Sequence, residues 1–172
     1  MTGDFIGFRK ATDQDSARIW EIILQAKEQM RLAGKRQWQD GYPAFEDIER
    51  DVVSGHGYVL CREDRAVAYG AVIFGEEPAY GTIRGEWKTE PPYVVVHRLA
   101  VAGEMKQRGM ARLFMQNVED LCRERGVESF RVDTNFDNAY MLRLLETLGF
   151  RYCGKIDYAG GERLAFEKRI EG

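Results

Sequence analysis

Apolar and polar residues alternate along the chain with two different periods, and each period predicts one kind of secondary structure. Apolar residues recur every three or four positions in four segments, which predicts four helices. These helices run from Asp13 or Asp15 to about Gly34, over residues 45–55, over about 109–125 and over 138–148. Gly34, Gly55 and Gly149 stand at or just after the ends of the first, second and fourth helices, as is common at helix C-termini.

Short runs rich in β-branched and aromatic residues predict seven strands. The runs are residues 5–11, 57–63, 65–75, 92–101, 129–135, 150–156 and 162–170. Glu63 and Asp64 separate the second run from the third and predict a hairpin turn between them. Residues 80–87 are interpreted as a further loop or an edge strand. The valine density of residues 92–101 indicates a strand buried on both faces.

The order of these elements predicts a single α/β domain over residues 1–172. No internal repeat, low-complexity tract or linker interrupts it. The sequence strand 92–101, helix 109–125 and strand 128–134 is a βαβ unit. Such a unit predicts two parallel strands joined by a right-handed crossover.

Composition and charge exclude several classes of function. The net charge of −3 on 172 residues argues against a broad basic surface for nucleic acid. No apolar run has the ~18 residues that a membrane span needs. The N-terminal residues lack the apolar core of a signal peptide, so a cytoplasmic protein is expected. Cys61, Cys122 and Cys153 are interpreted as buried free thiols, and with only two histidines no metal site is predicted.

The start of the third helix carries the clearest chemical signal, in the stretch KQRGMARLFM from Lys106 to Met115. A helix N-terminus leaves backbone N–H groups unpaired and carries a partial positive charge. Gly109 gives a ligand close access to this backbone, and Lys106, Arg108 and Arg112 add full charges. The pattern predicts a cradle for a phosphate or diphosphate. A solvated basic helix start with a turn glycine is the alternative interpretation.

The surroundings of this stretch resemble a known family. Strand HRLAV, the gap, Lys106-x-x-Gly109-x-Ala111 and an amphipathic helix are similar to motif A of the GNAT superfamily of acetyl-CoA-dependent N-acetyltransferases. Lys106 stands where that family has Gln or Arg. The segment NAYMLRLLETLGF from Asn138 to Phe150 is similar to the second block of the family. The stretch RVDTNFDN adds a resemblance to small bacterial members whose acceptors are generally unassigned.

The resemblance implies a fold and a cosubstrate. The fold is a mixed, twisted central sheet of about six to seven strands, with a splayed parallel central pair and about four flanking helices. The cosubstrate is acetyl-CoA, with its pantetheine arm on the backbone of one strand and its diphosphate on the following loop. The coenzyme-binding residues implied in this way are Leu99, Ala100, Val101, Gln107, Arg108, Gly109, Met110, Ala111, Arg112 and Asn138.

The resemblance also suggests residues for acetyl transfer, and here alternatives stay open. The backbone N–H of Val101 is the implied donor to the thioester oxygen. Asp133, five residues before Asn138, is one candidate general base, and His97 is its rival because imidazole titrates near neutral pH. Each is also explained by a structural role, and a water relay could replace both. The family's usual general acid is a tyrosine, but Leu145 occupies that position.

Acceptor contacts are expected from the region between the first two helices and from the late loops. The residues chosen are Trp38, Asp40, Tyr42 and Tyr80. Two aromatic rings and a carboxylate in one loop suit a small amine. The predicted function is N-acetyl transfer to a small-molecule or peptide amine by a monomer or homodimer, without nucleic-acid or membrane partners. A catalytically weak acyl-CoA-binding or regulatory domain and an unrelated nucleotide-phosphate binder are the alternatives.

Overall fold

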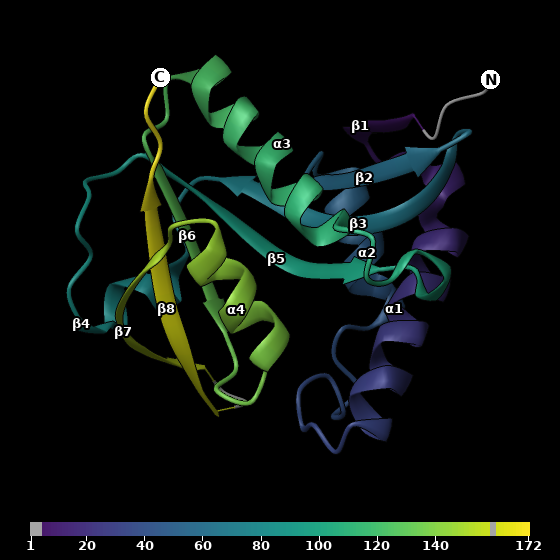
Figure 1. Cartoon of the computed structure of the whole chain (residues 1–172), viewed down its shortest axis with the longest axis horizontal. Helices are drawn as coiled ribbons and strands as arrows, with labels where there is room; N and C mark the ends of the chain where they lie inside the picture. The colour runs from purple at the N-terminus through teal and green to yellow at the C-terminus, as the bar shows by residue number, and fades with distance from the viewer. Residues whose placement is uncertain (1–4, 159–160) are drawn as a thin grey trace. The chain divides into compact units, whose positions relative to one another are not determined.

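The computed structural model describes residues 5–158 and 161–172, and Figure 1 labels the elements of this part. Its strands are β1 (Ile6–Lys10), β2 (Gly57–Arg62), β3 (Arg65–Phe74), β4 (Arg84–Gly85), β5 (Tyr93–Val101), β6 (Ser129–Thr134), β7 (Arg151–Tyr158) and β8 (Gly161–Arg169). Its α-helices are α1 (Ser16–Leu32), α2 (Phe45–Val53), α3 (Met110–Arg125) and α4 (Ala139–Thr147). Short 3-10 helices are η1 (Asp13–Asp15), η2 (Pro78–Thr82) and η3 (Gly103–Met105).

The chain divides into two compact units. The first unit comprises Met1–Val72 and His97–Asn117, and the second comprises Ile73–Val96 and Val118–Gly172. Strand β5 and helix α3 therefore each contribute residues to both units. That residues 1–172 form one domain stays a prediction.

In the first unit, β1, β2 and β3 lie side by side as antiparallel neighbours (Figure 1). Glu63 and Asp64 have positive φ values of 51° and 66°, the geometry of a tight hairpin turn, so the predicted hairpin is confirmed. Helix α1 turns its predicted apolar stripe into the core of this unit. The buried residues of that core are Ala11, Ile19, Ile22, Ile23, Ala26, Ile48, Val59, Cys61, Ala66, Tyr69, Ala100 and Ala102.

In the second unit, the start of β5 pairs with β6 in parallel, as the βαβ pattern predicts. The pairs are Tyr93 with Ser129, Val94 with Phe130 and Val95 with Arg131, and the pairing ends there although β6 continues to Thr134. Strand β8 is antiparallel to both β6 and β7, and β4 pairs with β7. A small apolar core of Tyr80, Tyr93, Val95, Ile156 and Ala165 lies in this unit.

The hydrogen-bonded strands follow the order β1-β2-β3-β5-β6-β8-β7-β4. The predicted mixed α/β sheet with a parallel central pair and four helices is confirmed for the described residues. The sheet has eight strands, one more than the upper end of the predicted range. The additional strand is β4, which pairs with β7 through only two residues, within the segment interpreted as a loop or edge strand.

The three cysteines are free and buried, as predicted from their apolar surroundings. Burial raises the pKa of Cys122 to about 12 and that of Cys153 to about 11, so both thiols keep their protons at neutral pH. In the described part of the chain, no helix has the length and apolar character needed to span a membrane.

Candidate functional site

The loop before α3 has the backbone shape of an anion cradle. Gln107 and Gly109 both have left-handed φ values, 63° and 76°, and α3 begins at the next residue, Met110. The N–H of Leu113 donates to the Gly109 carbonyl at 2.9 Å. The N–H groups of Met110 to Arg112 precede this bond, so helix geometry directs them out of the N-terminus.

Access to this backbone is open. No atom lies within 4 Å of the position that a Cβ on Gly109 would occupy. Gln107, Arg108, Gly109 and Arg112 are exposed, whereas Met110 and Ala111 are buried. The charged side chains therefore face solvent while the small and apolar ones anchor the first turn.

Phe114, one turn further along α3, fixes the helix within the first unit. Its ring is fully buried and meets Phe8 edge-on at a centroid distance of 5.4 Å. It also lies against Gly70 of β3, where a Cβ would come within 2.7 Å of the ring. A glycine in β3 thus gives α3 the close approach that fixes the cradle on the sheet.

Within strand β5, Arg98 has a left-handed φ of 57°. This conformation is uncommon for a residue with a long side chain. It breaks the regular alternation that would otherwise place His97, Leu99 and Val101 on one face of the strand. All three of these side chains are half-buried, while Ala100 is buried. The roles predicted for these four residues stay predictions.

The Arg98 side chain is held by a buried carboxylate on α2. Its Nε and Nη2 donate to the two oxygens of Asp51 at 2.8 and 2.6 Å, and Asp51 is only 4% exposed. The Tyr69 hydroxyl also donates to Asp51. Burial alone would lower the pKa of Arg98, but the hydrogen bonds and charge of Asp51 outweigh it and raise this pKa. Arg98 therefore keeps its charge.

The predicted acceptor residues of the first unit lie in different environments. Trp38 has a left-handed φ of 63° and packs partly buried against the core that contains Ile19. Asp40 is exposed, and the Tyr42 hydroxyl accepts a hydrogen bond from Arg98 Nη1 at 2.7 Å. This hydrogen bond connects Tyr42 to strand β5 at Arg98.

In the second unit, Asp133 lies at the centre of a tyrosine cluster. Tyr80 and Tyr158 both donate hydrogen bonds to its Oδ2, at 2.8 and 3.1 Å. The Tyr158 hydroxyl also lies 3.3 Å from Oε1 of Glu77. Asp133 itself is half-buried. The side chains come from β6, η2, the end of β7 and the residue before η2.

Tyr80, predicted as an acceptor contact, is only 1% exposed. Its ring lies between Trp87 and Tyr93, at centroid distances of 5.1 and 6.1 Å, and its carbonyl accepts from the Trp87 indole N–H. Burial, and next the charge of Asp133, raise the pKa of Tyr80 well above its ordinary value. Tyr80 therefore keeps its proton, and its buried hydroxyl donates a hydrogen bond to Asp133 from a fixed position.

Residues 138–148 were predicted to provide one coenzyme contact, and Leu145 among them occupies the position of the family's usual general acid. Asn138 caps α4, where its Oδ1 accepts from the Met141 N–H at 3.1 Å, and its contact with the coenzyme stays a prediction. Leu145 is fully buried, so the side chain at this position packs in the core.

The sequence did not indicate Glu77, Tyr158, Asp51 or Arg98 as site residues. Each of them meets its partner across a long stretch of chain. Tyr158 lies 25 positions after Asp133, and Arg98 lies 47 positions after Asp51. The signal that could have identified them is a polar residue inside an otherwise β-rich or helical apolar pattern.

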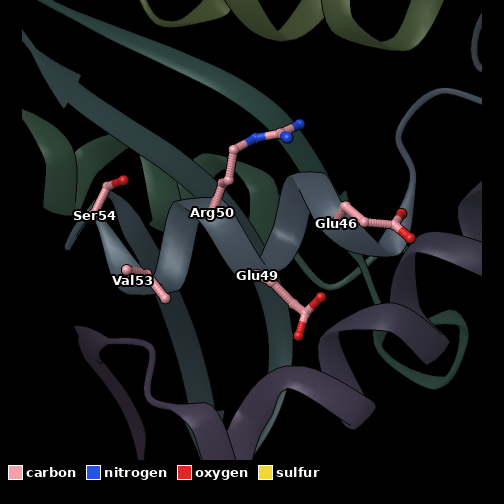
Figure 2. Close-up of a pocket in the computed structure, with 5 residues that line it drawn as sticks. All are labelled: Glu46, Glu49, Arg50, Val53 and Ser54. Atoms are coloured by element: carbon pink, nitrogen blue, oxygen red, sulfur yellow. The ribbon is translucent and has the colours of Figure 1, made fainter.

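A hollow on the exposed face of α2 lies apart from the residues predicted as the site. It is lined by Glu46, Glu49, Arg50, Val53 and Ser54, and Figure 2 shows the charged side chains pointing in different directions. A second hollow is lined by residues of β7, β8 and the segment before β5, including Lys88, Arg151 and Glu167. Neither hollow contains a residue of the predicted site. Among the described residues, no group of histidine, cysteine and carboxylate side chains could hold a metal ion.

Comparison with known proteins adds independent findings. The model of the acetyltransferase (GNAT) family matches residues 6–150. A crystal structure of a GNAT-family acetyltransferase from Streptococcus agalactiae is similar, with a TM-score of 0.88 and 33% identity, covering 97% of this chain and 96% of that one. No functionally curated protein matches the chain at a significant level.

Two more distant structures share the fold. A ribosomal-protein alanine N-acetyltransferase from Escherichia coli has a TM-score of 0.66 at 13% identity, with 98% of this chain and 96% of that one covered. An agmatine N-acetyltransferase variant has a TM-score of 0.69 at 19% identity, with coverage of 98% and 100%.

Proposed function

We propose that this chain, which belongs to the GNAT family of acetyltransferases, transfers the acetyl group of acetyl-CoA to a primary amine of a small molecule or peptide by direct attack in a ternary complex. The cradle at the start of α3 is the observation that carries the proposal. It combines left-handed backbone at Gln107 and Gly109, open space above Gly109 and the first N–H groups of a 16-residue helix.

The residues of the cradle fit the diphosphate of acetyl-CoA. Backbone N–H groups from Gly109 to Arg112 would hold its oxygens, and Arg108 and Arg112 would add charge at the exposed rim. Lys106 and Gln107 precede this turn. Leu99, Ala100 and Val101 would offer backbone groups to the pantetheine arm, and Asn138 would add a side-chain contact.

When bound, acetyl-CoA supplies an activated acyl group on a thiol that leaves with little help, because a thiol has a pKa of about 8.5. We assign the remaining work to the chain. Val101 N–H stabilises the carbonyl oxygen as it gains negative charge. Asp133 takes the proton that the acceptor amine loses on attack. Since Leu145 cannot donate a proton, water protonates the leaving thiolate.

The contacts of Asp133 support its role as the base. Its hydrogen bonds come from neutral hydroxyls, and both go to Oδ2. Oδ1 accepts no hydrogen bond from residues 5–158 or 161–172, so it offers a lone pair for a proton. His97 stays the rival base, to be separated from Asp133 by substitution.

The acceptor class rests on the acceptor-loop residues and on the names of distant relatives. Trp38, Asp40 and Tyr42 would receive the body of the acceptor. Agmatine and a ribosomal-protein alanine, the acceptors named for the two distant structures, are both amines.

Two measurements on the purified full chain test the proposal. Calorimetry compares the binding of coenzyme A with that of ATP, and release of free thiol from acetyl-CoA is followed against amines, amino acids, polyamines and aminoglycosides. We expect coenzyme A binding and thiol release with at least one amine class. Coenzyme A binding without transfer to any class would favour an acyl-CoA-binding domain, and binding of ATP alone would refute both functions.

Gly109→Asp tests the cradle itself. A carboxylate against the diphosphate should weaken coenzyme A binding by at least roughly 100-fold, a loss of ~2.7 kcal/mol. Gly126→Asp is the matched control, because Gly126 follows the other end of α3 with φ +68° and equally open space. Equal affinities in the two variants would show that the cradle does not bind the diphosphate.

A further inference from the structure

The Tyr158 hydroxyl lies between two carboxylates. It is 3.1 Å from Asp133 Oδ2 and 3.3 Å from Glu77 Oε1. A phenol carries one hydroxyl proton, so it can donate to only one of these oxygens at a time. Tyr80 differs, because among the described residues its hydroxyl donates only to Asp133, at 2.8 Å from a fully buried ring.

The phenol keeps its proton in both positions. Burial, and next the negative charges of Asp133 and Glu77, raise the pKa of Tyr158 above its ordinary value. Tyr158 therefore acts as a neutral donor whose direction can change, while its charge does not.

We infer that Tyr158 and Glu77 are positioning residues that tune Asp133 as a base: Tyr158 donates to Asp133 while Asp133 is charged and turns to Glu77 once Asp133 has taken a proton. The inference deepens the proposed function, because it rests on Asp133 as the base. The proton lost by the acceptor amine moves to Asp133, and Tyr158 retains its own proton throughout.

The physical reason is the strength of charge-assisted hydrogen bonds, which are about twice as strong as neutral ones. A protonated Asp133 is a weaker acceptor than a charged Glu77, so the hydroxyl follows the negative charge. If Glu77 were absent, Tyr158 would stabilise only the charged form of Asp133 and make it a weaker base. Glu77 offsets this effect by favouring the protonated form as well.

The titratable groups of this hydrogen-bond system lie on different elements. Asp133 lies on β6 and Tyr158 ends β7. Glu77 directly precedes η2, and Tyr80 lies within η2. The Tyr93 hydroxyl of β5 adds a contact by accepting from the Glu77 backbone N–H at 2.8 Å. This backbone bond helps to hold the Glu77 segment beside Tyr158.

We expect opposite effects from two substitutions. Tyr158→Phe removes a donor to the charged form of Asp133. In a plot of kcat against pH, the acidic limb (the fall of kcat at low pH) should therefore move to higher pH by about one unit. Glu77→Gln removes a negative charge and weakens the alternative acceptor, so the limb should move to lower pH by a similar amount. Tyr80→Phe should act like Tyr158→Phe.

Tyr152→Phe is the matched control, because Tyr152 is an exposed tyrosine of the same strand, β7. It should leave the limb in place. Titration of the Asp133 carboxyl carbon by NMR in the free protein gives the same comparison without an acceptor, and therefore without dependence on catalysis.

Opposite shifts in Tyr158→Phe and Glu77→Gln support the inference. Shifts in the same direction, or no shift in either variant, overturn the inference. A change in folding or in KM alone does not support it. If Asp133→Asn leaves kcat and the limb unchanged, the assignment of Asp133 as the base fails. In that case, the NMR titration still decides whether Tyr158 and Glu77 tune the carboxyl.

Discussion

Each unit of the molecule contains an aspartate that accepts hydrogen bonds from tyrosine, but the two carboxylates differ in their other partners. Asp51 in the first unit is 4% exposed, and both of its oxygens accept from Arg98. Asp133 in the second unit is half-buried and forms no ion pair with any lysine or arginine of the described residues.

From this difference we infer a structural role for Asp51, and it supports the proposed chemical role of Asp133. A carboxylate whose two oxygens both accept from one arginine has its orientation and charge committed to that pair. A carboxylate held by neutral hydroxyls on one oxygen keeps its orientation and offers the other oxygen. Neutralising Asp133 should therefore reduce turnover, whereas neutralising Asp51 should reduce stability.

Neutralising Asp133 should have the largest effect on turnover. Asp133→Asn keeps the volume and the acceptor oxygen for the tyrosines but removes the base, so kcat should fall by about 10²–10⁴. Thermal unfolding should stay near that of the unsubstituted protein. A kcat close to the unsubstituted value would assign the proton transfer elsewhere.

Neutralising Asp51 should instead reduce stability. Asp51→Asn leaves the Arg98 charge buried without its partner, which should cost about 3–5 kcal/mol of unfolding free energy. Urea denaturation measures this loss. The acidic limb of the kcat profile should not move in the folded variant, and a shift of that limb would show that the two clusters are not separate in function.

Replacing His97 sharpens the assignment of the base. His97→Ala should lower kcat by less than about tenfold, because a side chain that is not the base contributes only through packing and local charge. The pH profile with a fixed acceptor is the readout. A larger loss together with a lost acidic limb would move the base from Asp133 to His97.

Removing one hydroxyl from each cluster should have the smallest effect. Tyr69→Phe and Tyr80→Phe each delete one hydrogen bond to an aspartate, worth ~1 kcal/mol of stability. Only Tyr80→Phe should also move the acidic limb, since Asp51 takes no part in proton transfer. The same pH dependence of kcat in Tyr69→Phe and Tyr80→Phe would contradict the different roles inferred for Asp51 and Asp133.

Local sequence patterns predicted most of the fold because they act over short distances. The stripe of α1, the turn at Glu63 and Asp64, and the start of α3 all follow from neighbouring residues. The two-residue strand β4 had no period to reveal it, because Arg84 and Gly85 form a strand only through their pairing with β7.

The candidate site could be predicted only in part. Asp133 came from its spacing to Asn138, but Tyr158 and Glu77 meet it through the tertiary fold. The left-handed backbone of Arg98 was hidden because arginine rarely adopts it, and its partner Asp51 lies on another element, α2. Tyr80 has the aromatic ring expected of a binding residue. The structure instead buries this ring, and its hydroxyl donates to Asp133.

The proposal that Asp133 is the base of an acetyl transfer is best tested by a pH profile of single-turnover transfer. The purified chain, loaded with acetyl-CoA, would be mixed with an accepted amine over a range of pH, beside Asp133→Asn. We expect an acidic limb in the unsubstituted protein and its loss in the variant. A variant that retains the same limb and rate would contradict the role of Asp133.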